Sequence, residues 1–126
     1  MKLRIKGNSL RLRVSPSEME QLLQSGRVEE TIYFGADQDA RLTYALEHGA
    51  QAGAMTLLYR PQEVTVLISS REARDWAAGN GVGLYGATGS VHGPLELAVE
   101  KDFACLDKTG AENADTFPNP KQGAAC

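Results

Sequence analysis

Residues 2–18 read KLRIKGNSLRLRVSPSE. Apolar and basic residues alternate on both sides of the turn Gly7-Asn8, with the period of two that is typical of β-strands. We therefore expect a hairpin of strands 2–6 and 9–14. Successive side chains of a strand point to opposite faces, so the apolar residues face a core on one side. The opposite side then carries five cations: Lys2, Arg4, Lys6, Arg11 and Arg13.

A short helix is predicted directly after this hairpin, over residues 16–25. Ser15 can accept a hydrogen bond from the first backbone N–H groups and Glu18 can reach back to it, which is a capping box. Pro16 suits the first helical position because its missing N–H would have no partner there. Gly26 ends the helix, since a residue without Cβ adopts the left-handed conformation at little cost.

The same pattern of residue types recurs 54 residues further along. Residues 10–14 correspond to 64–68, and the capping segment 15–18 corresponds to 69–72. The remaining strands are expected at 28–34, 41–47, 55–60, 63–68, 82–85 and 95–99. The sequence therefore predicts two tandem strand-strand-helix-strand-strand units, residues 1–53 and 54–106.

These units define an α+β fold in one domain, residues 1–106, with two short helices. The eight strands are expected to form a mostly antiparallel sheet or a curled barrel. Residues 107–126 contain two prolines and few large apolar side chains, so we expect an irregular tail that Phe117 docks onto the body.

Charge is distributed unevenly along the chain, whose net charge is −3. Residues 1–17 hold five of the thirteen basic residues and none of the sixteen acidic ones. A pI near 5.4 argues against nucleic-acid binding. The amino terminus lacks the apolar run of a signal peptide or a membrane helix, so we expect a cytoplasmic protein without membrane contact. Cys105 and Cys126 are expected to be free thiols rather than a disulfide framework.

Two interpretations of the five cations remain open. Like charges side by side on a sheet are unfavourable unless something negative neutralises them. An anionic small molecule or an acidic protein surface is one such partner, and arginine suits it well. Cross-strand ion pairs are the other, with Glu29 or the last strand supplying the carboxylates: Glu96, Glu100 and Asp102.

Other motifs give no catalytic site or cofactor. The run Gly81 to Gly86 has the spacing of a dinucleotide fingerprint, but it follows a helix and enters a strand, which is the wrong context. His48, His92 and the two cysteines have no spacing that is typical of a metal site.

The opening segment MKLRIKGNSLRLR and the closing segments EKDFACL and NADTFPNP resemble a family of small uncharacterised bacterial proteins. That resemblance carries no activity, ligand or catalytic residue.

The doubled element order is also similar to that of triphosphate tunnel enzymes, although the alternating glutamates of their first strand are replaced here by Lys2, Arg4 and Lys6. Three hypotheses follow. The first is a non-catalytic binding or interaction module that uses the basic hairpin face. The second is a metal-dependent triphosphate hydrolase in which Glu96, Glu100 and Asp102 hold Mg²⁺ and the cations neutralise phosphate oxygens. The third is a structural subunit of a homo-oligomer that pairs through an exposed sheet edge.

Overall fold

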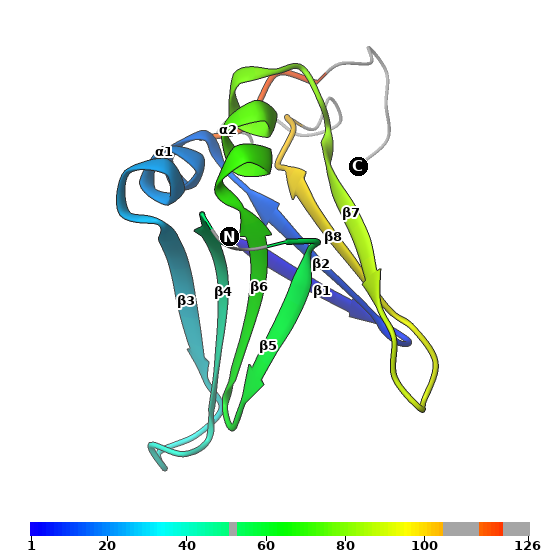
Figure 1. Ribbon diagram of the computed structural model, residues 1–126. Helices are drawn as coiled ribbons and strands as arrows, with labels where there is room; N and C mark the ends of the chain where they lie inside the picture. Colours follow the sequence, from blue (N-terminus) through cyan, green and yellow to red (C-terminus); the bar gives the residue numbers. More distant parts are fainter. Residues whose placement is uncertain (51–52, 105–113, 120–126) are drawn as a thin grey trace.

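The structure is a computed structural model that describes residues 1–50, 53–104 and 114–119. Its elements alternate hairpins and helices along the chain (Figure 1). In chain order they are β1 (Lys2–Lys6), β2 (Ser9–Val14), α1 (Pro16–Ser25), β3 (Arg27–Tyr33), β4 (Arg41–Gly49), β5 (Thr56–Arg60), β6 (Glu63–Ser69), α2 (Ser70–Ala78), β7 (Gly83–Thr88) and β8 (Leu95–Lys101). Each element agrees with the sequence-based expectation to within a few residues.

Two four-stranded sheets make up the fold. Sheet A has the order β1-β2-β8-β7, and sheet B has the order β3-β4-β6-β5. Within each sheet two antiparallel hairpins join through a central parallel pair, β2 with β8 and β4 with β6. Each sheet therefore contains one hairpin from the first half of the chain and one from the second.

This arrangement supports the α+β class and corrects the expected barrel. The four edge strands β1, β7, β3 and β5 do not pair with one another, so the sheets are not closed. A single sheet is also wrong, because the eight strands of the described residues form two mixed sheets, in which four of the six strand pairs are antiparallel. The alternation of residues predicts strands and their faces, but it contains no information about which hairpin lies beside which.

The caps of α1 form as expected. The Ser15 hydroxyl accepts from the Glu18 N–H, the Glu18 carboxylate accepts from the Ser15 N–H, and Gly26 adopts φ 84° at the carboxyl end. At α2 the Ser69 hydroxyl accepts a hydrogen bond from the Glu72 N–H. The Glu72 carboxylate, however, accepts a hydrogen bond from the Ser69 hydroxyl and not from the Ser69 backbone N–H. The second capping box is therefore only half formed.

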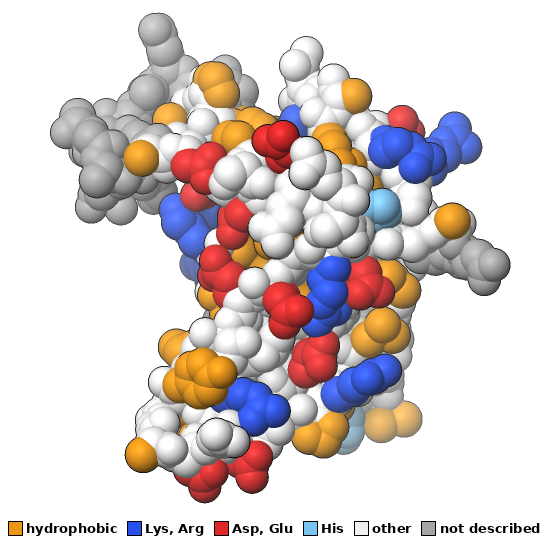
Figure 2. Space-filling view, turned by 90° about the vertical axis from the view of Figure 1, so that its left-hand side faces the viewer, with side chains coloured by type: hydrophobic (Ala, Val, Ile, Leu, Met, Phe, Trp, Pro, Cys, Tyr) orange, Lys and Arg blue, Asp and Glu red, His pale blue; other side chains and the backbone are white. Residues whose placement is uncertain are grey.

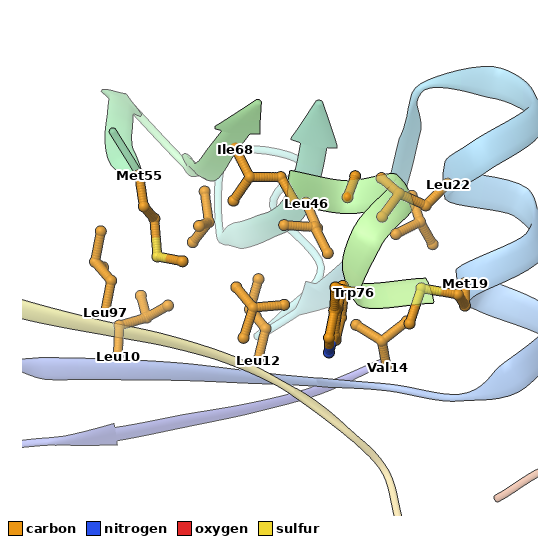
Figure 3. Close-up of a cluster of buried hydrophobic side chains, with 14 residues drawn as sticks. Leu10, Leu12, Val14, Met19, Leu22, Leu46, Met55, Ile68, Trp76 and Leu97 are labelled. Carbon is orange, nitrogen blue, oxygen red and sulfur yellow. The ribbon is translucent and has the colours of Figure 1, made fainter. Parts of the chain in front are cut away.

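The core lies between the sheets and beneath the helices (Figure 3). Leu12 from β2, Ile68 from β6 and Trp76 from α2 meet there, and all three are almost fully buried. Each such side chain contributes about 1.5–3 kcal/mol of burial. Further labelled members of the cluster are Leu10, Val14, Met19, Leu22, Leu46, Met55 and Leu97.

The two sheets diverge at the end opposite the helices, where the hairpin turns lie (Figure 1). Ile5, Ile32 and Tyr59 are on the core-facing sides of their strands, yet they are 62%, 47% and 73% exposed. Ile5 therefore lies on the expected face of its strand, but the expectation that its side chain is buried in the core is wrong. Phe117 does dock on the body, where its ring contacts Phe103 edge-on.

Candidate functional site

The outer face of sheet A collects all five cations of the first hairpin. In the antiparallel register Lys2 lies opposite Arg13 and Arg4 lies opposite Arg11. Residues directly opposite each other point to the same side of a sheet. The predicted basic face is thus present, on the side of β1 and β2 that points away from the core residues Leu10, Leu12 and Val14.

Strand β8 places carboxylates on this same face. Its parallel register with β2 sets Glu96 beside Ser9 and Glu100 beside Arg13. Asp102 follows Glu100 by two residues and forms an ion pair with Lys2 of 2.9 Å. Sequence periodicity therefore identifies the right three carboxylates, but only the sheet order shows that β8 is the neighbour of β2.

Glu100 is the centre of an ionic network. Its carboxylate lies 3.2 Å from Arg11 Nε and 3.8 Å from Arg13 Nε, and it accepts a 2.7 Å hydrogen bond from the Tyr85 hydroxyl. Burial, together with this hydrogen bond and the negative charge of Glu100, raises the pKa of the Tyr85 phenol above its usual range. A Cβ at Gly83 would lie 2.9 Å from Cγ of Glu100, so glycine at that position leaves room for the carboxylate.

Among the described residues, two cations and one carboxylate on this face are unpaired. The side chains of Arg4, Lys6 and Glu96 form no hydrogen bond there and no ion pair within 4.0 Å. All three are exposed. The ion-pair interpretation is therefore correct for Lys2, Arg11 and Arg13 and does not account for Arg4 and Lys6. Five cations against three carboxylates leave the face with a positive balance.

A hollow of about 330 Å³ lies on the same face beside the unpaired groups. Ala87 and Ala98 form part of its floor because they are small and lie on neighbouring strands, β7 and β8. Its walls carry Arg11, Tyr85 and Glu96. We call this concavity the sheet A hollow. Sequence reasoning missed Tyr85 and the two alanines, since their place beside Arg11 depends on the pairing of β8 with both β2 and β7.

Glu29 does not meet the basic hairpin. It lies on sheet B, where Arg27 contacts Glu29, Glu47 and Glu63 at 3.4, 3.1 and 2.6 Å. Burial alone would lower the pKa of Arg27, but hydrogen bonds to these carboxylates outweigh it and raise the pKa. On the side of the molecule nearest β3, acidic and basic side chains are intermingled (Figure 2). Sheet B therefore neutralises the half-buried charge of Arg27 internally, and among the described residues of its strands Arg60 is the single Lys or Arg without an ion pair.

The carboxylates proposed for a metal do not form a centre. Over residues 1–50, 53–104 and 114–119, no three His, Cys, Asp or Glu side chains are grouped so that they could hold a metal ion. Glu100 and Asp102 instead neutralise neighbouring cations, and the barrel that a tunnel requires is not formed.

Of the remaining candidate ligands, His48 lies away from this face. His48 bridges the helices, with its ring nitrogens 2.8 Å from the Ser70 hydroxyl and 3.0 Å from the Leu22 carbonyl oxygen. Cys105, Cys126 and most of the expected tail lie outside the described residues.

Comparison with known proteins identifies the family of this chain. The chain belongs to a family of unknown function, DUF7009, whose model matches residues 1–121. This confirms the resemblance to small uncharacterised proteins. No curated protein and no solved structure matches the chain. None of the helices in the described part of the chain is long and apolar enough to span a bilayer.

Proposed function

We propose that this protein is a cytoplasmic, non-catalytic binding module that holds a small anionic ligand on the outer face of sheet A. One observation carries the proposal: Arg4 lies directly opposite Arg11, and neither Arg4 nor Lys6 has a carboxylate partner among the residues that the structure describes. Opposed residues of an antiparallel pair have Cα atoms about 5 Å apart, so like charges there are destabilising unless an anion lies between them. Two guanidinium groups at this spacing can grip one phosphate or carboxylate group.

The hollow favours a small molecule over an acidic protein surface. Low-molecular-weight ligands bind in concavities, and one of about 330 Å³ adjoins Arg11. Small pockets of this size are typical of low-molecular-weight ligands.

Isothermal titration with pyrophosphate tests the proposal. The double variant Arg4→Gln/Lys6→Gln removes the two unpaired cations. Hydrogen bonds to charged groups contribute about 1.5–3 kcal/mol each when shielded and less at exposed positions, so we expect a loss of about tenfold or more in affinity. The affinity should also fall as salt is added, because exposed charges are screened.

The matched control is Arg71→Gln/Arg74→Gln. Both arginines are exposed on α2, so the control changes the net charge equally at a distance from the face. It should bind pyrophosphate within about twofold of the unaltered protein. Equal weakening in both double variants would show a non-specific charge effect. The absence of binding by pyrophosphate, citrate and nucleotides alike would reject the proposal.

A structural role in a homo-oligomer is the second candidate, because β1 lies at an edge of sheet A. Its alternating Lys2, Arg4 and Lys6 are the kind of charges that keep edge strands from pairing with another chain. We therefore expect a monomer by light scattering coupled to size-exclusion chromatography. A stable dimer that Arg4→Gln/Lys6→Gln strengthens would favour the structural role.

We also propose that the fold contains an internal duplication of one strand-strand-helix-strand-strand unit. The starts of β5, β6 and α2 each follow those of β1, β2 and α1 by 54 residues. Each half supplies its first hairpin to one sheet and its second to the other. This arrangement supports descent of both halves from one ancestral unit. The cluster of five cations is present on the first hairpin, β1 and β2, and not on the corresponding hairpin, β5 and β6.

A further inference from the structure

Charges of opposite sign line the two sides of the sheet A hollow. Arg11 on β2 forms the positive side, and Arg4 lies opposite Arg11 on β1, outside the hollow. Glu96 on β8 forms the negative side, and its carboxylate has no partner among the described residues. A ligand with only an anionic group would leave the Glu96 carboxylate without a partner and would be repelled by that carboxylate. The hollow is therefore better matched by a ligand that carries both charges.

The register gives the span between these charges. Arg11 pairs with Ala98, and Glu96 lies two residues before Ala98 on the same strand. One strand spacing and two residues along the strand separate the Cα atoms of Arg11 and Glu96 by about 8 Å. Both side chains are long and border the hollow, so the two charged groups can approach a ligand of only a few atoms from either side.

Tyr85 adds a second feature that suits a cation. Its side chain lines the hollow and is 61% exposed, while its hydroxyl is fixed by Glu100. An aromatic face attracts ammonium groups, and a neighbouring carboxylate strengthens the attraction. The floor of Ala87 and Ala98 lets such a group reach the sheet surface without steric conflict.

We propose that the sheet A hollow binds a small zwitterion, whose oxyanion group contacts Arg11 and whose ammonium group lies between Glu96 and the Tyr85 ring. This inference rests on the proposed function, because it uses Arg11, one of the same cations. It goes further by naming the ligand class, an oxyanion joined to an ammonium by a short linker. Phosphoethanolamine has this chemistry, either free or as a lipid headgroup.

Titration with three probes isolates the role of each charge. O-phosphoethanolamine carries both groups, inorganic phosphate only the anion and ethanolamine only the cation. We expect O-phosphoethanolamine to bind about fivefold more tightly than phosphate, the gain of one exposed ion pair, and ethanolamine to bind weakest. Glu96→Gln should abolish this preference, because it weakens the binding of the zwitterion and removes the repulsion of phosphate. Glu63→Gln, which removes a carboxylate from the Arg27 cluster of sheet B, should preserve it.

The outcomes separate this inference from the proposed function. Equal affinity for phosphate and O-phosphoethanolamine, or a preference that survives Glu96→Gln, would overturn the zwitterion while leaving an anion site intact. Failure of every anionic probe would reject both. Sedimentation with phosphatidylethanolamine vesicles distinguishes the sources: co-sedimentation that Glu96→Gln abolishes assigns the headgroup, and binding of the free compound alone assigns a soluble ligand.

Discussion

Glu100→Gln is expected to strengthen anion binding. The Glu100 carboxylate lies 3.2 Å from Arg11 Nε and 3.8 Å from Arg13 Nε, so it acts as an internal anion on the proposed site. Glutamine has nearly the same shape and still accepts a hydrogen bond from Tyr85. The substitution therefore removes one negative charge from the face without removing the side chain that covers Gly83.

The size of the effect follows from Coulomb's law. An anion bound on the far side of the Arg11 guanidinium lies about 6 Å from the Glu100 carboxylate, where the repulsion is about 0.7 kcal/mol in water and about 2.8 kcal/mol at an effective dielectric constant of 20. The Arg11 side chain is 38% exposed, so solvent screening favours the lower part of this range. We expect affinity for pyrophosphate to rise by about threefold to tenfold.

Isothermal titration at low and moderate salt measures this gain. Glu47→Gln is the matched control, because Glu47 contacts Arg27 on sheet B and its loss changes the net charge equally. The pKa of Tyr85, which Glu100 raises, should fall in Glu100→Gln when its ring resonances are followed by NMR against pH. Unchanged or weaker pyrophosphate binding in Glu100→Gln, with the fold intact, would refute the competition between Glu100 and the ligand.

Two further predictions concern stability. Gly83→Ala should destabilise the protein by about 1–3 kcal/mol or more, because its Cβ would lie 2.5 Å from the Val99 carbonyl oxygen. Urea denaturation measures this loss. The control is Gly89→Ala, where a Cβ would have no neighbour within 4 Å among the described residues. A loss no larger than that of Gly89→Ala would contradict it. Glu18→Gln should reduce stability near neutral pH by an amount that shrinks on acidification. Burial alone would raise the pKa of Glu18, but hydrogen bonds from the Met1 ammonium and from Ser15 outweigh it and lower the pKa below 4.5. The carboxylate therefore contributes above pH 4.5 and loses its contribution as pH falls through the lowered pKa. A stability difference that grows toward low pH would contradict the assignment.

Local sequence determines most of the elements of this fold. Alternation from Lys2 to Val14, the Ser15–Glu18 cap and the Gly26 terminator act between residues close in the chain, and each is present as expected. These signals also assign the faces of β2 correctly, since Leu12 and Val14 are buried while Arg11 and Arg13 are not.

Contacts between segments that are distant in the chain could not be predicted from these local signals. The parallel pairing of β2 with β8 joins residues near the two ends of the described domain, and no local signal in either strand selects it. For the same reason the partners of the cations were only partly identified: Glu100 is beside Arg13, but Glu29 is on the other sheet beside Arg27. The sheet A hollow depends wholly on this pairing, which is why Tyr85 was missed.

Mapping of pyrophosphate onto the ¹⁵N-labelled protein by NMR tests the central claim most directly. In the proposed site, the unpaired cations of β1 form the contact surface for the anion. Titration should therefore shift the amide resonances of Arg4, Lys6 and Arg11, and of Ala98 on the neighbouring strand, more than any others. Shifts centred on the Arg27 cluster of sheet B, or no shifts at millimolar pyrophosphate, would contradict the account.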